Sequence, residues 1–186
     1  MKLTGVLFLI LFLLTGCDDT PKEIERGMAF RSLLLRGNGC RFDAKITADY
    51  VDSIEYFAVS CTGNSEGVLS FTVTEPETIA GITGYVSEEA GILTFDTIAV
   101  QFDKMAENRV TPVSAPWIFL KTLRSGYIRF GCMEGELLRL TLDDSFEDDA
   151  LQLDIWMDER DVPIRGEILW NGRRILTLDI ENFTVL

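Results

Sequence analysis

Apolar and polar residues alternate along most of the chain after residue 40, with the period of two that is typical of half-buried strands. The clearest run extends from Phe42 to Tyr50, where apolar residues occupy every second position. Asn171-Gly172, between two such runs, is the strongest hairpin signal in the chain. The alternation predicts strands at 42–50, 54–62, 67–75, 82–87, 91–97, 98–103, 127–133, 136–142, 150–157, 163–170 and 173–180, with a short tail at 182–186.

Two other segments carry the signals of helices. Thr20-Pro21-Lys22-Glu23 is typical of a capping box with proline at the first helical position, and Gly37-Asn38-Gly39 is a helix stop. An amphipathic helix is therefore predicted from residue 21 to 36. Ser114-Ala115-Pro116-Trp117 predicts a second, shorter helix that ends near Gly126.

The order of these elements predicts one α+β domain. One helix and about half of the strands precede the second helix, and the other strands follow it. A twisted antiparallel sheet of about 10–11 strands tends to curl or close, and each strand here has an apolar face that needs cover. We therefore expect a curled antiparallel sheet whose concave, apolar side is crossed by two or three helices.

The first residues have the character of an export signal. Val6 to Leu14 is almost wholly apolar, follows a single early lysine, and is too short to span a bilayer. Leu14-Thr15-Gly16-Cys17 resembles the lipobox of bacterial lipoproteins, in which the cysteine receives a diacylglycerol and becomes the first residue of the mature protein. The alternative is an ordinary secretory signal with a cysteine near its end.

This resemblance implies a division of the chain into three parts. Residues 1–16 would be the signal peptide, 17–20 the lipidated end and a short tether, and 21–186 the folded domain. Two acyl chains on Cys17 would anchor the protein firmly on the extracytoplasmic side of the cell membrane. Asp18 and Asp19 resemble an inner-membrane retention signal if the cell is Gram-negative and have no such meaning if it is Gram-positive, and both contexts stay open.

Charge and composition exclude several classes of function. The net charge of −13 argues against nucleic acid as a partner and against electrostatic docking on anionic lipid heads, so attachment to the membrane would depend on the acyl chains. The chain has no histidine, which removes every Ser-His or Cys-His arrangement and the commonest metal ligand. No phosphate-binding loop and no cofactor motif is present. We therefore expect a protein that is not an enzyme and needs no cofactor.

The cysteines other than Cys17 give no metal or redox motif. Cys40, Cys61 and Cys132 are an odd number, so at least one thiol stays unpaired, and no C-x-x-C spacing occurs. Cys40 and Cys61 both fall on the apolar phase of a predicted hairpin. A disulfide between them and two separate buried thiols are both open, and the apolar setting favours the thiols.

The order of elements resembles the LolA/LolB-like lipoproteins and lipoprotein carriers. The resemblance covers nearly all of the mature chain: a lipobox, an amphipathic helix, a hairpin of Phe42 to Tyr50 and Ile54 to Cys61, the passage from Phe71 to Thr78 that ends in Glu-Pro-Glu-Thr, and a helix begun at Pro116. It is closest to small LolA-like lipoproteins of Gram-positive cells. The resemblance implies an unclosed antiparallel half-barrel covered by helices. Classical carriers lack the cysteine, so Cys17 makes this chain resemble the receptor or other anchored relatives and argues against a shuttling role.

The apolar strand faces are the main candidate site. As the lining of a cavity they would bind acyl chains by burying apolar area, whereas in a filled core they would pack on each other. Trp117, Phe119 and Leu120 in the second helix would either cover a bound lipid or pin the helix to the sheet. The residues predicted to line the concave side are Phe57, Val59, Leu69, Phe71, Leu93, Phe95, Trp117, Phe130, Leu138, Leu140, Leu153, Ile155 and Ile168.

Two functions follow as alternatives. The first is a membrane-anchored lipoprotein that binds a lipid or lipidated ligand, such as a lipoprotein, in the concavity of the half-barrel. The second is an interaction or scaffold lipoprotein with a filled core that presents an acidic surface to a protein partner. An acidic connection between two strands could in principle hold calcium, but it lacks the spacing of a calcium loop and is interpreted as a solvated turn: Asp143, Asp144, Glu147, Asp148 and Asp149.

Overall fold

The computed structural model describes residues 21–49, 53–96, 98–103, 105–106, 109–148 and 150–186. The predicted signal peptide and tether, residues 1–16 and 17–20, lie outside the described residues. The elements are α2 Lys22–Arg36, β1 Gly39–Asp49, β2 Ile54–Asn64, β3 Leu69–Glu75, β4 Thr83–Val86, β5 Gly91–Phe95, β6 Ile98–Phe102, β7 Met105–Ala106, β8 Arg109–Val110, the 3-10 turn η1 Pro112–Ser114, α3 Ala115–Ser125, β9 Tyr127–Glu134, β10 Leu137–Asp143, β11 Gln152–Met157, β12 Pro163–Trp170 and β13 Arg173–Val185.

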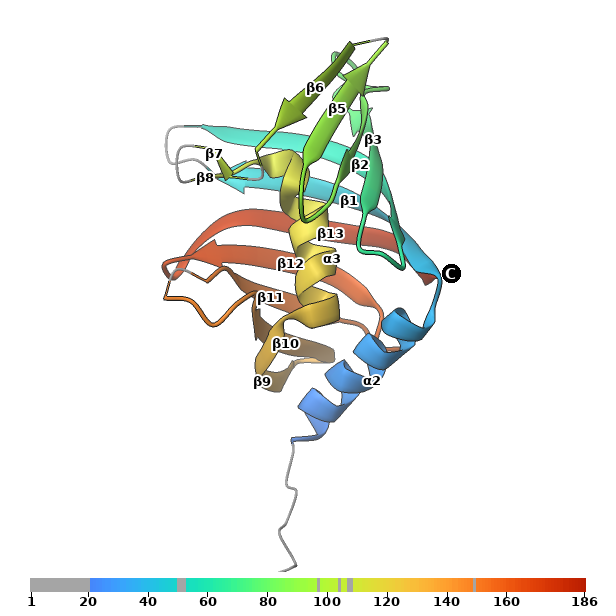
Figure 1. Cartoon of the computed structure of the whole chain (residues 1–186). Helices are drawn as coiled ribbons and strands as arrows, with labels where there is room; N and C mark the ends of the chain where they lie inside the picture. The colour runs from blue at the N-terminus through green and yellow to red at the C-terminus, as the bar shows by residue number, and fades with distance from the viewer. Residues whose placement is uncertain (1–20, 50–52, 97, 104, 107–108, 149) are drawn as a thin grey trace, which may run out of the picture.

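Eleven strands form one antiparallel sheet that does not close. Their order is β6-β5-β4-β3-β2-β1-β13-β12-β11-β10-β9, so β1 and β13 are neighbours at the centre and β6 and β9 are the two edges. Figure 1 shows the sheet curled around α3, which crosses its concave side. The expected α+β fold, a curled and unclosed antiparallel sheet with helices across its concave face, is confirmed.

Three details differ from the sequence prediction. The predicted strand 173–180 and the tail 182–186 form one strand, β13, which continues past Asn182. The segment between β6 and α3 contains the short hairpin β7–β8, which was not expected. Pro21 occupies the N-cap of α2 and not its first helical position, and its carbonyl accepts hydrogen bonds from the amides of Ile24 and Glu25 at 2.9 and 3.1 Å.

The core lies between the concave face and the two helices. Successive strands turn alternate residues inward, so that the side chains of Phe42, Ala44 and Ile46 are buried while their neighbours face outward. α3 crosses the middle of the concave face, and α2 packs against the end formed by β9 and β10. The inner faces of both halves of the sheet therefore share one hydrophobic core.

Candidate functional site

Most of the predicted lining residues lie in this core. The structure brings together, as buried side chains, Val59, Leu69, Phe71, Trp117, Leu138, Leu140, Leu153, Ile155 and Ile168. Phe57 and Leu93 are partly buried against the same core. Phe95 and Phe130 do not belong to this group, since both are more than half exposed.

Side chains of α3 fill the middle of the concavity. Phe119 is 0% exposed, and its ring centroid lies 5.9 Å from that of Phe42. Opposite it stands Gly166, where a Cβ would lie only 2.8 Å from Cδ2 of Phe119. A Cβ at Gly63 of β2 would likewise clash with the side chain of Leu120. The helix sits this close because the strands beneath it carry glycine at the contact points.

The first turn of α3 is held to the rim of the sheet. The indole Nε1 of Trp117 donates a hydrogen bond to the backbone carbonyl of Gly67 at 3.0 Å. The ammonium group of Lys121 lies 5.2 Å from the centroid of the same ring and forms an ion pair with Glu88 at 3.2 Å. Trp117, Phe119 and Leu120 thus pin α3 to the sheet, which is one of the two roles considered for them.

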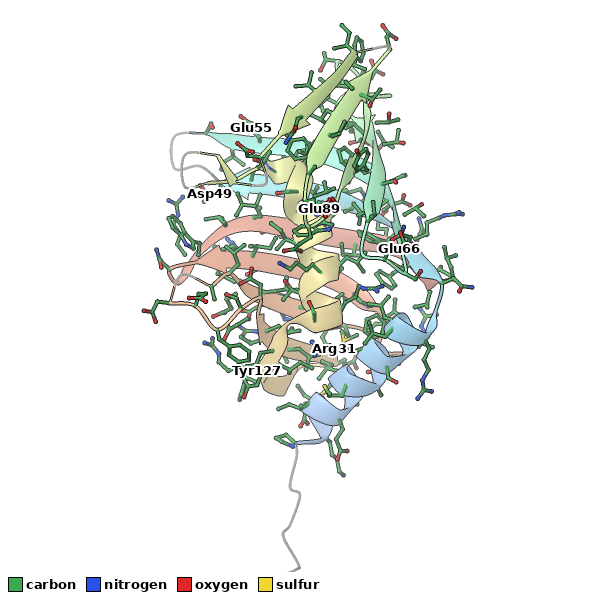
Figure 2. All side chains as sticks on the ribbon, in the orientation of Figure 1. Arg31, Asp49, Glu55, Glu66, Glu89 and Tyr127 are labelled. Atoms are coloured by element: carbon green, nitrogen blue, oxygen red, sulfur yellow. The ribbon has the colours of Figure 1, made fainter. Side chains whose placement is uncertain are left out.

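α2 covers the other end of the concavity. Phe30 and Leu34 are buried, and Gly27 allows the helix to approach Leu140 of β10. Arg31 joins the two helices, because its guanidinium donates to the backbone carbonyl of Leu123 at 2.7 Å (Figure 2). Burial of that guanidinium lowers the pKa of Arg31 from its usual value. Side chains of both helices therefore fill space on the concave face, and most of the predicted lining residues are buried in the same core.

The hollows lined by described residues include four that are open to the surface. The largest of these four, about 570 Å³, lies on the outer face and is lined mainly by Ser and Thr side chains of β2 to β5, with Arg41 and Asp43. Hydrogen bonds from Asn182 and Ser60 lower the pKa of Asp43. The others lie beside α2 (510 Å³), over the outer side of α3 (300 Å³) and on the outer face of β1 to β3 (190 Å³). These hollows are not the predicted concavity.

The concave face continues, without helix cover, onto the hairpin of β5 and β6, here called the β5–β6 arm. The register runs from buried Phe71 through Gly84 and Leu93 to Val100, so Val100 lies on the inner face, with Phe95 and Ile98 beside it. Ile98 is 64% exposed, and Phe95 and Val100 are similarly open. Figure 1 shows the arm extending beyond the first turn of α3. Of the predicted lining residues, Phe95 is therefore the one that reaches an open apolar surface.

The two edges of the sheet differ in their protection. β9 is packed against α2 and carries Arg129 and Glu134. β6 reads Ile-Ala-Val-Gln-Phe, without charge or proline, and among the described residues it pairs with β5 alone. Charges, proline and covering elements are the features that normally keep an edge strand from adding another strand. The uncharged run 98–102 is visible in the sequence, but its place at an edge of the sheet is not.

Phe130 is on the opposite face from the one predicted. It pairs with Thr141, whose side chain points to the outer face, whereas Ile128 pairs with Leu142 on the inner face. A bulge between Thr141 and Leu142 reverses the phase of β9 at this point. The prediction that Phe130 faces the concave side is wrong for this reason.

The outer face beside Phe130 contains a buried carboxylate. Asp154 is 2% exposed and accepts hydrogen bonds from Thr141 Oγ1 at 2.7 Å and from Arg139 at 2.6 Å. The hydrogen bond that Arg139 donates to Asp154 raises the pKa of Arg139. The guanidinium groups of Arg139 and Arg165 lie 5.2 and 5.5 Å from the centroid of the Trp156 ring. We interpret this cluster as structural.

The acidic connection between β10 and β11 is arranged as a turn. Asp143 pairs with Arg129 at 3.4 Å, and Asp144 accepts a hydrogen bond from the amide of Leu151 at 2.8 Å. Asp149 lies outside the described residues. Among the residues that are described, no group of three or more potential metal ligands is found.

The thiols of Cys40, Cys61 and Cys132 are free, so the prediction of separate thiols is confirmed. Burial raises the pKa of the Cys40 thiol to about 11, and it raises that of Cys61 further. Both therefore stay in the unreactive thiol form at neutral pH. In the part of the chain that the structure covers, no helix has the length and apolar character needed to cross a membrane.

No protein-family model matches the chain, and no curated protein matches it. Similar solved structures include a LolA superfamily protein from Nitrosomonas europaea (7% identity, 89% of this chain and 92% of that chain, TM-score 0.48). Another is a putative outer membrane lipoprotein-sorting protein domain from Vibrio parahaemolyticus (8%, 86% and 90%, TM-score 0.46). A third is a chain from the structure of the Clostridioides difficile CwlD amidase with the GerS lipoprotein (13%, 93% and 100%, TM-score 0.46).

At these identities no ligand, partner or activity is transferred from those proteins to this chain. The resemblance to the LolA/LolB-like half-barrel is one of fold, and it rests on the strand order and on the helices across the concave face.

Proposed function

We propose that this chain is a lipid-anchored protein of the cell envelope that acts by binding a protein partner, without catalysis. The observation that carries this proposal is the filled concavity. Nine of the thirteen side chains predicted to line a lipid cavity are buried in one core with Phe119, Leu120 and Phe30. This supports the interaction function over lipid storage inside the half-barrel, because a bound acyl chain needs space that these side chains occupy.

The proposed anchor is a diacylglycerol on Cys17. If the lipobox is used, mass spectrometry of the protein produced from its full sequence in a bacterial host will find an N-terminus that begins at a diacylated Cys17. A Cys17→Ser variant is the control, and it should keep residues 1–16 and lack the added lipid. A mature N-terminus that carries a free cysteine would contradict the anchor.

The proposed binding surface is the β5–β6 arm, and the proposed occupant is an extended strand of the partner. A strand added to β6 would pair with its free backbone groups, while its alternate side chains would pack on Phe95, Ile98 and Val100. A lipid would gain apolar contact with these side chains but would leave the backbone groups of β6 unpaired. A strand therefore fits this edge better than a lipid does.

Photo-crosslinking tests this surface. The photoreactive residue p-benzoylphenylalanine replaces Ile98 in the full-length chain, expressed in the bacterium that encodes it, with Thr72 on the outer face of β3 as the control position. We expect a discrete protein adduct from position 98 and none from position 72. The added change Val100→Lys should abolish the adduct by placing a charge in the contact, whereas Thr62→Lys on the outer face of β2 should leave it unchanged.

Two results would contradict the proposal. One is the absence of any adduct at position 98. The other is an adduct whose added mass is that of a lipid, which would favour ligand binding at the open end of the half-barrel. Both variants replace exposed side chains, so their unfolding free energies should stay within about 0.5 kcal/mol of the parent protein.

A further inference from the structure

A groove of 510 Å³ runs between α2 and the end of β13, and is here called the α2 groove. Its apolar wall is formed by Phe30 and Leu33 of α2 and by Phe183, Val185 and Leu186 at the end of the chain. Leu33 is 56% exposed and Leu186 is 50% exposed.

The groove is fixed by contacts at both ends. At one end Arg26 of α2 donates a hydrogen bond to Asp161 in the turn between β11 and β12, at 2.8 Å. At the other end the carbonyl of Leu186 accepts from the amide of Asn38 at 2.8 Å, and the amide of Leu186 donates to the carbonyl of Gly39 at 2.9 Å. In the floor, the rings of Phe30 and Phe183 meet at 5.8 Å. The exposed leucines are thus held by a rigid frame.

Two arginines lie at the rim of the groove, although the net charge of the chain is −13. Arg36 and Arg160 both line it, and Asp161 is the acidic side chain among the lining residues. Asp161 is already bound by Arg26, and Arg160 reaches Asp158 at 3.1 Å. An apolar trough with arginines at its edge is suited to a molecule with acyl chains and a phosphate group.

The helix α2, which forms one wall of the groove, begins close in sequence to the proposed anchor. Three residues lie between Cys17 and Pro21, so the Cα atoms of these two residues are four residue spacings apart, at most about 14 Å when the chain is fully extended. α2 itself is about 22 Å long, so the anchor is short enough for the helix to lie against the surface in which Cys17 is embedded.

We propose that the α2 groove is a membrane-contact site that receives the acyl chains and phosphate groups of phospholipids around the anchor. This inference rests on the proposed lipidation of Cys17. The overall negative charge opposes electrostatic attachment, so the contact works locally, with Leu33 and Leu186 entering the bilayer surface and Arg36 meeting phosphate. This contact gives the domain a fixed orientation on the membrane. The β5–β6 arm lies at the far end of the molecule from the start of α2 (Figure 1), so in this orientation the arm points away from the membrane.

Tryptophan quenching tests the orientation. Leu33→Trp and Leu35→Trp are made in the full-length lipidated chain and reconstituted in vesicles of equal parts phosphatidylglycerol and brominated phosphatidylcholine. Leu35 is a matched control, since it is 51% exposed on the same helix but lines the hollow next to α3. After subtraction of the emission of the parent protein, L33W should be quenched at least about twofold, and L35W should not be quenched. Arg36→Glu should reduce the quenching of L33W, whereas Arg41→Glu on the outer face should not.

Equal quenching of L33W and L35W, or none in either, would overturn the inference. The mass of Cys17 is measured on the same samples. A diacylated Cys17 with unquenched L33W would refute the membrane contact alone, whereas an unlipidated Cys17 would refute the anchor and the contact together.

Discussion

Replacing Phe119 by alanine is expected to lower the free energy of unfolding by about 3–5 kcal/mol, as for large aromatic side chains truncated in well-packed cores. The ring is fully buried, packs on Phe42 and lies directly over Gly166. Its removal would leave a void between α3 and the sheet, and the strands on either side of Gly166 are fixed by their ladder bonds and cannot close it.

Urea unfolding followed by circular dichroism would measure this loss. Phe146→Ala is the matched control, because that ring is 89% exposed and its truncation should change the unfolding free energy by less than about 0.5 kcal/mol. A loss below about 1 kcal/mol for Phe119→Ala would mean that the ring faces an open space, and would contradict the filled concavity. The result therefore bears directly on the choice between the two proposed functions.

Asp154→Ala is expected to cost about 2–4 kcal/mol of stability, because it removes the acceptor from three donors, on Thr141, Arg139 and Gln152, that remain buried or partly buried. Thr141 Oγ1 and the guanidinium of Arg139 both donate to this carboxylate. Arg139 Nε is already without a hydrogen-bond partner among the described residues, so the variant would leave the guanidinium still less satisfied.

The same unfolding experiment provides the measurement, with Asp179→Ala as the control. Asp179 is an exposed carboxylate on β13, which is separated from β11 by β12, and its loss should be nearly neutral. The double variant Asp154→Leu with Arg139→Met should recover most of the lost stability, since it removes both members of the pair together. Equal losses for Asp154→Ala and Asp179→Ala would show that the cluster contributes nothing specific.

The elements of this fold could be predicted from sequence because their signals are local. The alternation from Phe42 onward marks which side chains of β1 face the core, and Ser114-Ala115-Pro116 marks the start of α3. The signals fail where the backbone leaves its regular period. Asn182 has a φ of +55°, and the bulge there separates two apolar runs that belong to one strand. The bulge opposite Phe130 reversed its predicted face in the same way.

The state of the concavity could not be predicted, because it depends on contacts between distant parts of the chain. A list of apolar strand residues fits an empty lining and a filled core equally well. The outcome is decided by the depth at which α3 sits, and that depth is set by Gly63 and Gly166, which are far from α3 in sequence. The exposure of the arm depends likewise on where α3 begins, and not on the composition of β5 or β6.

The pairing of β1 with β13 at the centre of the sheet has a consequence for how the protein reaches its folded state. The two halves of the sheet are joined through strands that lie more than 120 residues apart, so this pairing is the most non-local in the fold. A chain that crosses a membrane with its N-terminus first delivers β1 early and β13 last. If the chain is exported in this way, as we propose, one side of β1 is an open edge during that interval and its core-facing apolar side chains are exposed. Fast export, or another protein that shields the edge, would then favour correct folding.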